Sequence, residues 1–395
     1  MSSGYGRPMP SHDAELTEVG PGRPGGEFLR RFWQPVGLSS ELTDLPTRVR
    51  VLGEDLILFR DGQGRPGLLD EHCCHRGTSL YYGRVEADGI RCCYHGWLYD
   101  VEGLCLDQPC EPPDSTYKER VRQPWYPCRE YHGLVFTYMG PHDRMPVLPR
   151  YDLIEEGDGV VVPEGTSYGL GGGTVLDCNW VQIYENVMDP FHVTVLHSRF
   201  SGEQFSKALA VLPEVRWEET ERGVCSIQDR RLGDGQVFRR VTELVMPNIR
   251  IVSSVAAGTG REGFKRAAHI GWILPIDDTH TRMYSLLRVA LADGMPVMPP
   301  RARHNDKLWA DLTDEEHQRM PGDKEAIVSQ RAIAVHALDH LATSDRGVIM
   351  VRKMIKHEIE ATRQGADPRG VIRDPAKDLV TTRAGNYLVT SGTRA

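Results

Sequence analysis

Two short segments of the chain place cysteine and histidine at spacings that could hold a metal cluster. The first offers Cys73 and His75 as C-x-H, the second offers Cys92 and His95 as C-x2-H, and a glycine follows each histidine within two residues. Two cysteines on one iron and two histidines on the other are the ligands of a [2Fe–2S] cluster whose potential is raised by its neutral imidazoles. If each segment gives one ligand to each iron, two facing turns can clamp the whole cluster.

A structural zinc ion is the alternative occupant, because two cysteines and two histidines also form a zinc site. Zinc loops usually pair like ligands, as C-x2-C or H-x3-5-H. The mixed pairs of this chain, each followed closely by glycine, favour the iron–sulfur cluster. A second thiol neighbours each presumed ligand, but choosing Cys73 and Cys92 preserves both spacings. We therefore interpret Cys74 and Cys93 as non-ligands and His72 as a bystander.

A second motif contains two histidines five residues apart, His192 and His197, with Asp189 three residues before the first. Positions i and i+5 do not share one tight face of an α-helix, so a helix end or bend is needed for both imidazoles to reach one ion. Two histidines and one carboxylate form the facial triad that holds non-haem Fe(II). H-x4-H alone is equally consistent with two structural histidines near a surface, but the cluster motif in the same chain favours iron.

Spacing alone does not identify the carboxylate of this triad. Asp189 could bind the metal directly, or it could accept the second N–H of a metal-bound His192. A downstream residue would then complete the triad, and the candidates are Asp323, Asp339 and Glu325. Asp323 stands just before a helical pattern, where an aspartate is also common as a simple N-cap.

Length and composition are those of an ordinary globular protein. The 395 residues suffice for two domains, and the contents of 40% hydrophobic and 26% charged residues are typical. The net charge of -8 argues against a nucleic-acid or membrane-surface partner. The N-terminus lacks the basic and apolar regions of a signal peptide, and no apolar run is long enough to span a bilayer. Nine cysteines in such a chain indicate a reducing, cytoplasmic compartment with metal-bound or free thiols.

The elements expected to hold the first motif are short strands. In the N-terminal segment, residues 1–35, the stretch before Phe28 is rich in glycine and proline, so we expect it to be mobile, and a short helix is expected over 28–33. Residues 36–150 alternate strand-like runs and turns, which predicts a small all-β domain around the metal. Its expected strands cover 48–52, 55–60 and 133–138, with a turn at 61–64.

Residues 151–395 combine strands and helices, which predicts a domain of α+β class around the second motif. A helix is expected over 180–196, and a helical stretch over 324–363 with a break at 345–347. The region opens with the apolar run 159–162, and antiparallel strands are expected at 224–227, 249–252, 270–274 and 283–289. A glycine-rich stretch covers 169–173, and a long loop is expected over 292–322.

With these motifs the chain resembles the large (alpha) subunits of the Rieske-type non-haem iron aromatic-ring hydroxylating oxygenases, and among them the phthalate dioxygenase-like group. The two cluster segments carry the resemblance, together with Asn179–Trp180 and Glu185–His192, which are similar to the iron-site helix of the family. The likeness extends over nearly the whole chain. It implies an all-β Rieske [2Fe–2S] domain at 36–150 and a helix-grip-like catalytic domain, with an antiparallel sheet and helices, at 151–395.

The resemblance also assigns roles to single residues. The residues that match the cluster ligands are Cys73, His75, Cys92 and His95. The residues that match the iron ligands are His192, His197 and Asp323. Asp189 matches the aspartate that bridges the two metal centres, and with Asn186 it is expected to take part in catalysis. The family often has proline at the position of Cys74 and a non-cysteine residue at that of Cys93, so the chain departs from the pattern there.

The function implied by the resemblance is that of a terminal oxygenase. An NADH-dependent reductase or a ferredoxin passes electrons to the cluster, and the mononuclear Fe(II) then activates O2 beside an aromatic substrate such as an aromatic carboxylate. The family is typically trimeric, and Asp189 would link His192 to His95 of a neighbouring subunit. Five arginines of the strand region could bind a substrate carboxylate, although facing solvent is the commoner situation for any one of them. These are Arg230, Arg231, Arg239, Arg240 and Arg250.

Three other functions fit parts of the sequence. The same scaffold could act as a monooxygenase or as an O-demethylase on a methoxyaromatic compound, because a fold does not determine its chemistry. An electron-transfer Rieske protein needs no second iron, so iron at His192 and His197 would argue against it. A non-catalytic assembly subunit would keep the fold without binding that iron.

Overall fold

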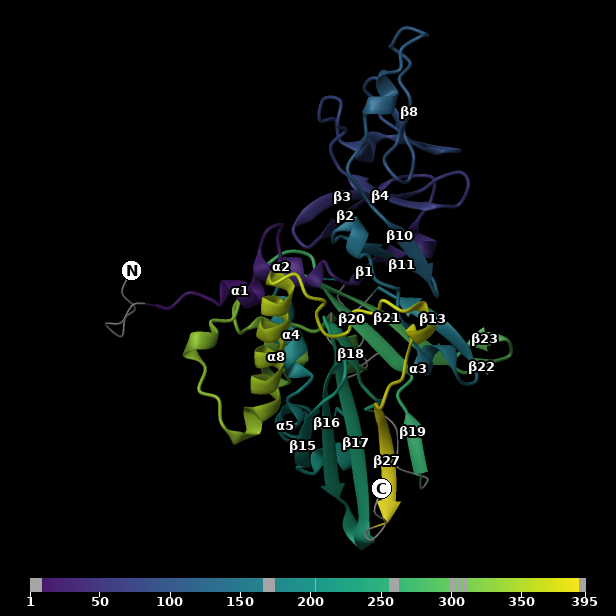
Figure 1. Ribbon diagram of the computed structural model, residues 1–395. Helices are drawn as coiled ribbons and strands as arrows, with labels where there is room; N and C mark the ends of the chain where they lie inside the picture. Colours follow the sequence, from purple (N-terminus) through teal and green to yellow (C-terminus); the bar gives the residue numbers. More distant parts are fainter. Residues whose placement is uncertain are drawn as a thin grey trace. The chain divides into compact units, whose positions relative to one another are not determined.

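The computed structural model describes residues 9–165, 175–202, 204–255, 263–298, 303–304, 307–308 and 311–390. The chain divides into two compact units, one formed by Arg30–Pro146 and the other by Met1–Leu29 together with Val147–Ala395 (Figure 1). The boundaries expected at residues 36 and 150 lie a few residues beyond the observed ones. The glycine-rich stretch at 169–173 falls outside the described residues.

The smaller unit, Arg30–Pro146, is all-β and consists of antiparallel sheets. One sheet has the order β1 (Trp33–Leu38), β11 (Leu134–Tyr138) and β10 (Cys128–Tyr131). Another has the order β2 (Thr47–Val51), β3 (Glu54–Arg60), β4 (Pro66–Asp70) and β9 (Trp125–Tyr126). A further sheet has the order β5 (Arg84–Glu86), β6 (Gly89–Arg91), β7 (Leu98–Tyr99) and β8 (Cys105–Asp107). The strands expected at 48–52, 55–60 and 133–138 are confirmed as β2, β3 and β11.

A tight turn and a buried core give this small unit its order. Leu52 and Gly53 join β2 to β3 with φ angles of +48° and +79°, as is typical of a two-residue type I′ hairpin. The core beneath the sheets contains large apolar side chains such as Phe59, and it also contains the side chains of Cys73 and Cys92. The first metal motif is therefore anchored in packed core.

The larger unit is built around an antiparallel sheet that has ten strands among the described residues. Its main path has the order β13 (Val160–Glu164), β21 (Thr281–Val289), β20 (His269–Pro275), β18 (Ile249–Ile251), β17 (Gln236–Val245), β16 (Gly223–Arg231) and β15 (Glu214–Glu219). The strand β14 (Val175–Leu176) pairs with β21, and β27 (Gly385–Thr390) pairs with β17 and with β19 (Gly263–Arg266). The four expected strands of this region are confirmed within this sheet as β16, β18, β20 and β21.

Helices lie beside this sheet (Figure 1). The helix α8 (Arg346–Arg363) packs against α4 (Trp180–Asn186), α1 (Ala14–Thr17) and α2 (Pro24–Leu29), and α4 is followed by α5 (Pro190–Thr194). The short helices are α3 (Asp152–Glu155), α6 (Asp314–Arg319) and α7 (Asp323–Val328). The short strands are β12 (Arg150–Tyr151), β22 (Leu291–Ala292), β23 (Met295–Pro296), β24 (Arg303–His304), β25 (Lys307–Leu308) and β26 (Leu379–Val380). One all-β unit and one unit of mixed sheet and helix confirm the predicted α+β class.

The N-terminal segment differs from expectation. The helix α2 ends at Leu29, whereas the sequence suggested a helix over 28–33. Phe28 and Leu29 are fully buried, and a Cβ atom at Gly26 would lie 2.2 Å from the carbonyl oxygen of Val19. Glycine in this segment allows two stretches of backbone to approach closely. The expectation of a mobile stretch is therefore wrong for residues 14–27, which include α1 and most of α2.

The long loop expected over 292–322 contains a helix that the sequence analysis missed. A capping box begins α6, because Glu316 N donates to Thr313 Oγ1 at 3.3 Å and Thr313 N donates to Glu316 Oε2 at 2.8 Å. The helical stretch expected over 324–363 is divided into α7 and α8. The break between them begins after Val328 and is much longer than the one expected at 345–347.

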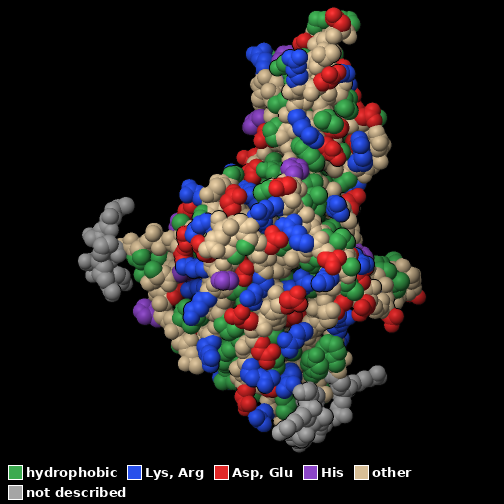
Figure 2. All heavy atoms as spheres, in the orientation of Figure 1, with side chains coloured by type: hydrophobic (Ala, Val, Ile, Leu, Met, Phe, Trp, Pro, Cys, Tyr) green, Lys and Arg blue, Asp and Glu red, His purple; other side chains and the backbone are tan. Residues whose placement is uncertain are grey.

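No described helix has both the length and the apolar character needed to cross a bilayer. On the face shown in Figure 2, basic and acidic side chains are interspersed rather than gathered by sign.

Candidate metal centres

Two loops of the smaller unit share one internal hydrogen-bond pattern. In each loop the cysteine amide, of Cys73 or Cys92, donates to the carbonyl five residues later at 2.9 Å. The glycine amide donates back to the same cysteine's carbonyl, at 2.8 Å for Gly77 and 3.1 Å for Gly96. Both glycines have a φ angle near +75° (+76° and +75°), which glycine adopts at little cost. The two segments therefore form matching tight turns.

The cysteines and the histidines of the two loops differ in burial. Cys73 and Cys92 are buried and their thiols interact with each other. His75 and His95 are half-buried, with ring centroids 4.5 Å apart. The ring of His75 also stacks on Trp97 of the other loop at 4.2 Å. A buried pair of cysteines and a less buried pair of histidines on the same two loops fit the cysteine iron and the histidine iron of a Rieske cluster.

Hydrogen-bond donors surround the buried thiols. The Cys92 thiol, the Tyr99 hydroxyl and the amides of His75 and Arg76 lower the pKa of the Cys73 thiol against the raising effect of burial. The Tyr99 hydroxyl lies 3.1 Å from the Cys73 sulfur. Such donors favour a thiolate, which is the form that binds metal.

The residues interpreted as non-ligands are displaced from this buried pair. Cys74 and Cys93 are exposed. His72 is exposed as well, and its Nδ1 lies 3.0 Å from the carbonyl oxygen of Gly77. His72 therefore contacts the backbone of the first loop from its exposed side, a role that its position in the sequence did not indicate.

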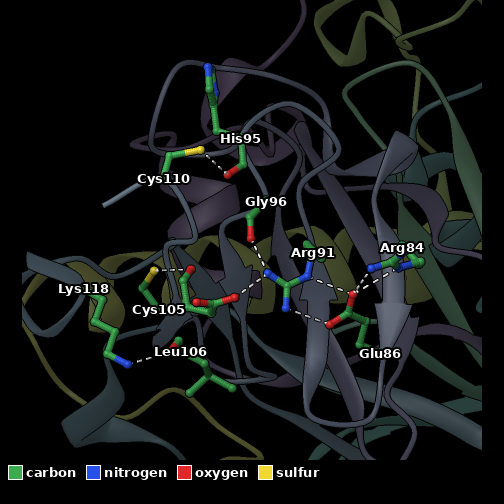
Figure 3. Close-up of polar contacts among 10 residues, drawn as sticks. Arg84, Glu86, Arg91, His95, Gly96, Cys105, Leu106, Cys110 and Lys118 are labelled. Atoms are coloured by element: carbon green, nitrogen blue, oxygen red, sulfur yellow. Dashed lines mark hydrogen bonds and ion pairs between the residues drawn. The ribbon is translucent and has the colours of Figure 1, made fainter. Parts of the chain in front are cut away.

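An arginine that the sequence analysis missed supports the second loop. Arg91 precedes Cys92 and donates to the carbonyl of Gly96 at 2.5 Å and to Asp107 at 2.7 Å (Figure 3). On its other side Arg91 makes a two-pronged pair with Glu86, at 2.8 and 2.9 Å. No metal-ligand spacing could have identified Arg91, because it acts through a backbone carbonyl.

In the larger unit, the two histidines of the second motif lie on consecutive pieces of helix. The helix expected over 180–196 ends at Asn186 and restarts at Pro190. Asp189 is the N-cap of α5, since its side chain accepts from the amides of Phe191 and His192 at 2.9 and 3.3 Å. After α5 the chain continues as a π-helical stretch, Val195–Phe200, that carries His197. This wider turn is the bend that an i, i+5 pair requires.

Asp323 completes the group from the first residue of α7. Its Oδ1 lies 3.0 Å from Nε2 of His197 and 3.4 Å from Nε2 of His192. The ligand atoms of the three residues all lie within 4.8 Å of one another, and no other such group occurs in the part of the chain that the structure describes. Two imidazoles and a carboxylate at this separation fit a non-haem iron.

Burial raises the pKa of Asp323, but the hydrogen bond from His197 and the charges of both histidines lower it to about 2.

The two other carboxylates left open by the sequence have other partners. Asp339 lies 2.8 Å from Arg352, and Glu325 accepts from the amide of Gly322 at 2.8 Å. Of the three alternatives, Asp323 alone is placed against the histidines.

Outer contacts orient the imidazoles. Nδ1 of His197 lies 2.7 Å from Oε1 of Gln204. Nδ1 of His192 lies 3.6 Å from Oδ2 of Asp189, which is longer than a hydrogen bond. These contacts direct both Nε2 atoms towards Asp323. Gln204 was not predicted from the sequence, because a glutamine seven residues after a histidine is not a pattern that indicates contact with a metal ligand.

Asn186 lies at the end of α4, with its Nδ2 3.5 Å from Oδ1 of Asp323. The preceding residue, Glu185, is buried and binds Arg352 of α8 at 2.5 and 2.7 Å. Burial raises the pKa of Glu185, and the pair with Arg352 opposes that rise. The end of α4 is thus held to α8 on one side and approaches the metal donors on the other.

Comparison with known proteins agrees with this geometry. Residues 32–149 match the Rieske [2Fe-2S] domain, and residues 176–361 match the vanillate O-demethylase oxygenase C-terminal domain. The chain is 46% identical over 393 residues to phenoxybenzoate dioxygenase subunit alpha of Ectopseudomonas oleovorans, covering 97% of this chain and 93% of that protein. It is 34% identical over 407 residues to the phthalate 4,5-dioxygenase oxygenase subunit of Pseudomonas putida, covering 91% and 88%. Its fold is similar to that of Pseudomonas putida CBB5 NdmA with caffeine, with a TM-score of 0.64 at 21% identity, covering 89% of this chain and 99% of that chain.

The chain therefore belongs to the Rieske non-haem iron oxygenases, as an oxygenase (alpha) subunit related to the phthalate dioxygenase group. It is an enzyme of the class that carries a Rieske [2Fe–2S] cluster and a mononuclear iron, and it is the terminal oxygenase component that receives electrons from another protein. The His2Asp set described above fits the mononuclear iron in residue type and in separation, and the Cys2His2 set fits the cluster in residue type.

Proposed function

We propose that this enzyme hydroxylates an aromatic carboxylate. The observation that carries the proposal is the presence of two donor sets in one chain. One is the Cys2His2 set of the two loops. The other is the His2Asp set, whose ligand atoms lie within 4.8 Å of one another. The relatives support the substrate class, because two of them are named for phenoxybenzoate and phthalate.

In this proposal four residues hold the cluster and three hold the iron. The cluster ligands are Cys73, His75, Cys92 and His95. The iron ligands are His192, His197 and Asp323. Bound there, the cluster supplies single electrons and the iron supplies the centre at which O2 is activated.

The chain's own residues prepare the iron donors. Gln204 accepts the Nδ1 proton of His197, and Asp189 faces Nδ1 of His192, so that both Nε2 atoms keep their lone pairs for the metal. The ring of Phe205 packs 4.2 Å from that of His197 and shields one side of the site from water. The carboxylate of Asp323 and the two oriented imidazoles would hold a mononuclear iron, which would supply the chemistry of O2 activation.

Asp189 and Asn186 are the remaining residues to which we assign catalytic roles. Asn186 steadies the carboxylate of Asp323. Asp189 lies in the path of electrons arriving at His192, from His95 of a neighbouring subunit in a homotrimer. An NADH-dependent reductase or a ferredoxin supplies those electrons in the cytoplasm.

A single turnover tests this function without the unidentified reductase. Chemically reduced, iron-loaded protein is mixed with 18O2 and with phenoxybenzoate, phthalate or methoxyarenes, and products are identified by mass spectrometry. The expected product carries two labelled oxygen atoms on an aromatic acid. If none of the acids yields a product while both metals are present at full content, the proposal is contradicted.

A monooxygenase or O-demethylase acting on a methoxyaromatic compound is the second candidate. The match of residues 176–361 to the vanillate O-demethylase oxygenase domain favours it. In the same experiment it would add one labelled oxygen or remove a methyl group. An electron-transfer protein would instead be reduced and reoxidised without product and without iron at His192 and His197.

A further inference from the structure

One face of the catalytic sheet carries two buried positive charges. Residues directly opposite each other on neighbouring strands share a face. Arg230 lies opposite Phe238, and Gln228 lies opposite Arg240, so all four project from one face of β16 and β17. Arg230 is fully buried and Arg240 is 3% exposed. The next strand, β27, places Asn386 opposite Arg240 on that face.

Both guanidinium groups donate to uncharged acceptors. Arg230 donates from Nε to the carbonyl of Val211 at 3.0 Å and from Nη1 to Oε1 of Gln228 at 3.1 Å. Its buried Nη2 has no partner among the described residues. Arg240 donates to two backbone carbonyls at 2.6 and 3.1 Å, and its Nη1 lies 3.5 Å from Oδ1 of Asn386. Among the residues that the structure describes, neither arginine has a carboxylate at ion-pair distance.

This arrangement is unfavourable without an anion. Burial lowers the pKa of Arg230 to about 10, and burial together with the charge of Arg230 lowers that of Arg240 to about 9. Both side chains therefore remain protonated at neutral pH. Two like charges in a buried place cost free energy unless a counter-charge accompanies them. A carboxylate is a suitable counter-charge, because its oxygens accept directed hydrogen bonds from a guanidinium.

The same face is linked to α5, the helix that carries His192 and leads into the π-helical stretch of His197. Thr194, on α5 between His192 and His197, donates from Oγ1 to the carbonyl of Val211 at 3.3 Å. That carbonyl is also the acceptor for Nε of Arg230. One backbone oxygen thus joins the guanidinium of Arg230 to the candidate iron helix.

An apolar layer connects the charged pair to the metal donors. Phe238, opposite Arg230, belongs to a buried cluster against which Phe205 packs. The ring of Phe205 in turn lies 4.2 Å from the ring of His197. Aromatic side chains near the metal and buried cations at the far end of the layer suit a ligand with one aromatic end and one anionic end.

Two of the other arginines expected near the substrate, Arg231 and Arg239, do not share these properties. Arg231 and Arg239 are the neighbours of the buried pair in sequence, so they project from the opposite face. Arg231 pairs with Glu214 at 3.0 Å, and Arg239 pairs with Asp229 at 2.6 Å. Burial lowers the pKa of Arg250 to about 10 as well, but Arg250 lies on β18, and the charge of Asp323 opposes this lowering. The solvent-facing interpretation therefore suits Arg231, which is exposed, and not Arg230 or Arg240.

We propose that Arg230, with Arg240 beside it, binds the carboxylate group of the aromatic acid on which the enzyme acts. The proposal rests on the proposed function and specifies the substrate contact within it. The carboxylate accepts from Nη2 of Arg230 and offsets both buried charges. The aromatic part of the substrate lies along the layer of Phe238 and Phe205, on the side of the iron histidines.

Equilibrium binding to the iron-loaded enzyme tests this contact. Dissociation constants are measured by titration calorimetry with phenoxybenzoate and phthalate as anionic probes and phenoxybenzamide as the neutral probe. Arg230→Gln should weaken binding of phenoxybenzoate by about 10–100-fold, as expected for a lost charge-assisted contact, and should change that of phenoxybenzamide by less than about threefold. Arg230→Lys keeps the positive charge but lacks the planar guanidinium, so its affinity for phenoxybenzoate should fall less than that of Arg230→Gln. Arg231→Gln and Arg239→Gln are the matched controls and should bind all probes as the wild type does.

Three results would overturn the proposal. Arg230→Gln could lose affinity for phenoxybenzoate and for phenoxybenzamide to the same extent and melt at a lower temperature than the wild type. Arg230 would then stabilise the fold and not bind the carboxylate. The variant could bind phenoxybenzoate as tightly as the wild type does. Alternatively, the wild type could bind the amide and neither acid. Failure of the proposed function has a different signature, in which the wild type binds phenoxybenzoate through Arg230 but yields no oxygenated product in a single turnover.

Discussion

The two candidate metal centres are constructed in opposite ways. The cluster donors lie on two loops close in sequence, each closed by the same backbone hydrogen bonds and a glycine of positive φ. The iron donors come from α5, from a π-helical stretch and from α7, and Asp323 stands 126 residues after His197. Local backbone geometry thus shapes the first site, whereas packing among distant elements shapes the second.

This contrast has a consequence for robustness. A change in the packing of α4, α7 or α8 should disturb the iron site and leave the cluster loops intact. A change beside the cluster loops should have the reverse effect. Each of the following variants is therefore assayed for iron, for acid-labile sulfide and for turnover, so that the two sites are followed separately.

Asp323→Ala should have the largest effect. Removing one donor of three should abolish iron binding and turnover, while the visible absorption of the cluster stays unchanged. The matched control is Asp339→Ala, which removes a carboxylate of α7–α8 that contacts Arg352 instead of the histidines. An Asp323→Ala protein with full iron content would refute the assignment of this ligand.

Asp189→Asn should reduce coupled turnover by at least about 100-fold and retain both metals. The amide oxygen can still cap α5, whereas the charge that faces His192 is lost. Steady-state turnover with an electron-donor system is compared with metal content. Near-normal turnover in this variant would exclude Asp189 from the electron path.

Gln204→Leu should weaken iron binding by about 10–100-fold, because His197 loses the acceptor of its Nδ1 proton. The measurement is iron retention during dialysis against a graded series of chelator concentrations. Sulfide content should not change. Equal loss of iron and sulfide would show that the variant perturbs the whole chain instead of one imidazole.

Arg352→Met should destabilise the larger unit by about 3 kcal/mol, because it leaves the buried carboxylate of Glu185 without its partner. The double variant with Glu185→Gln should recover most of that loss. Urea unfolding followed by tryptophan fluorescence measures both. If the double variant is no more stable than the single one, the cost does not come from the unpaired carboxylate.

Glu86→Gln should have the smallest effect, confined to the smaller unit and dependent on pH. The hydrogen bond from Arg91 lowers the pKa of Glu86 from 4.5 to about 2, so the pair stabilises the fold above pH 4.5 and loses its effect as the pH falls towards 2. Because the pair is partly exposed, its contribution should be below about 1 kcal/mol. The difference in melting temperature between wild type and variant should shrink with acidification, and a constant difference would contradict this account.

Several features of the molecule could be predicted from residues close together in sequence. The C-x-H and C-x2-H spacings with their glycines predicted the cluster loops, because backbone bonds within six residues shape them. The strands β2, β3 and β11 followed from short runs of strand-forming residues bounded by turn residues. The capping box of α6 was equally visible at Thr313 and Glu316 and could have been predicted.

Other features depended on contacts that no local pattern encodes. Gly26 looked like a flexible residue, but it permits close packing against Val19. Gln204 and Arg91 act on residues whose positions relative to them follow from the folded chain. Spacing also left Asp323, Asp339 and Glu325 as equal candidates, and Asp323 was singled out in the sequence only by resemblance.

The sequence by itself determined which kinds of donor the chain can offer and where the tight loops lie, because residue type and short-range backbone bonds are local properties. The tertiary structure decided which carboxylate meets the two histidines, and which arginines are buried without a carboxylate partner among the described residues. The reason is physical, since burial and long-range contacts depend on how sheet and helices pack, and neighbours such as Arg230 and Arg231 project from opposite faces of one strand.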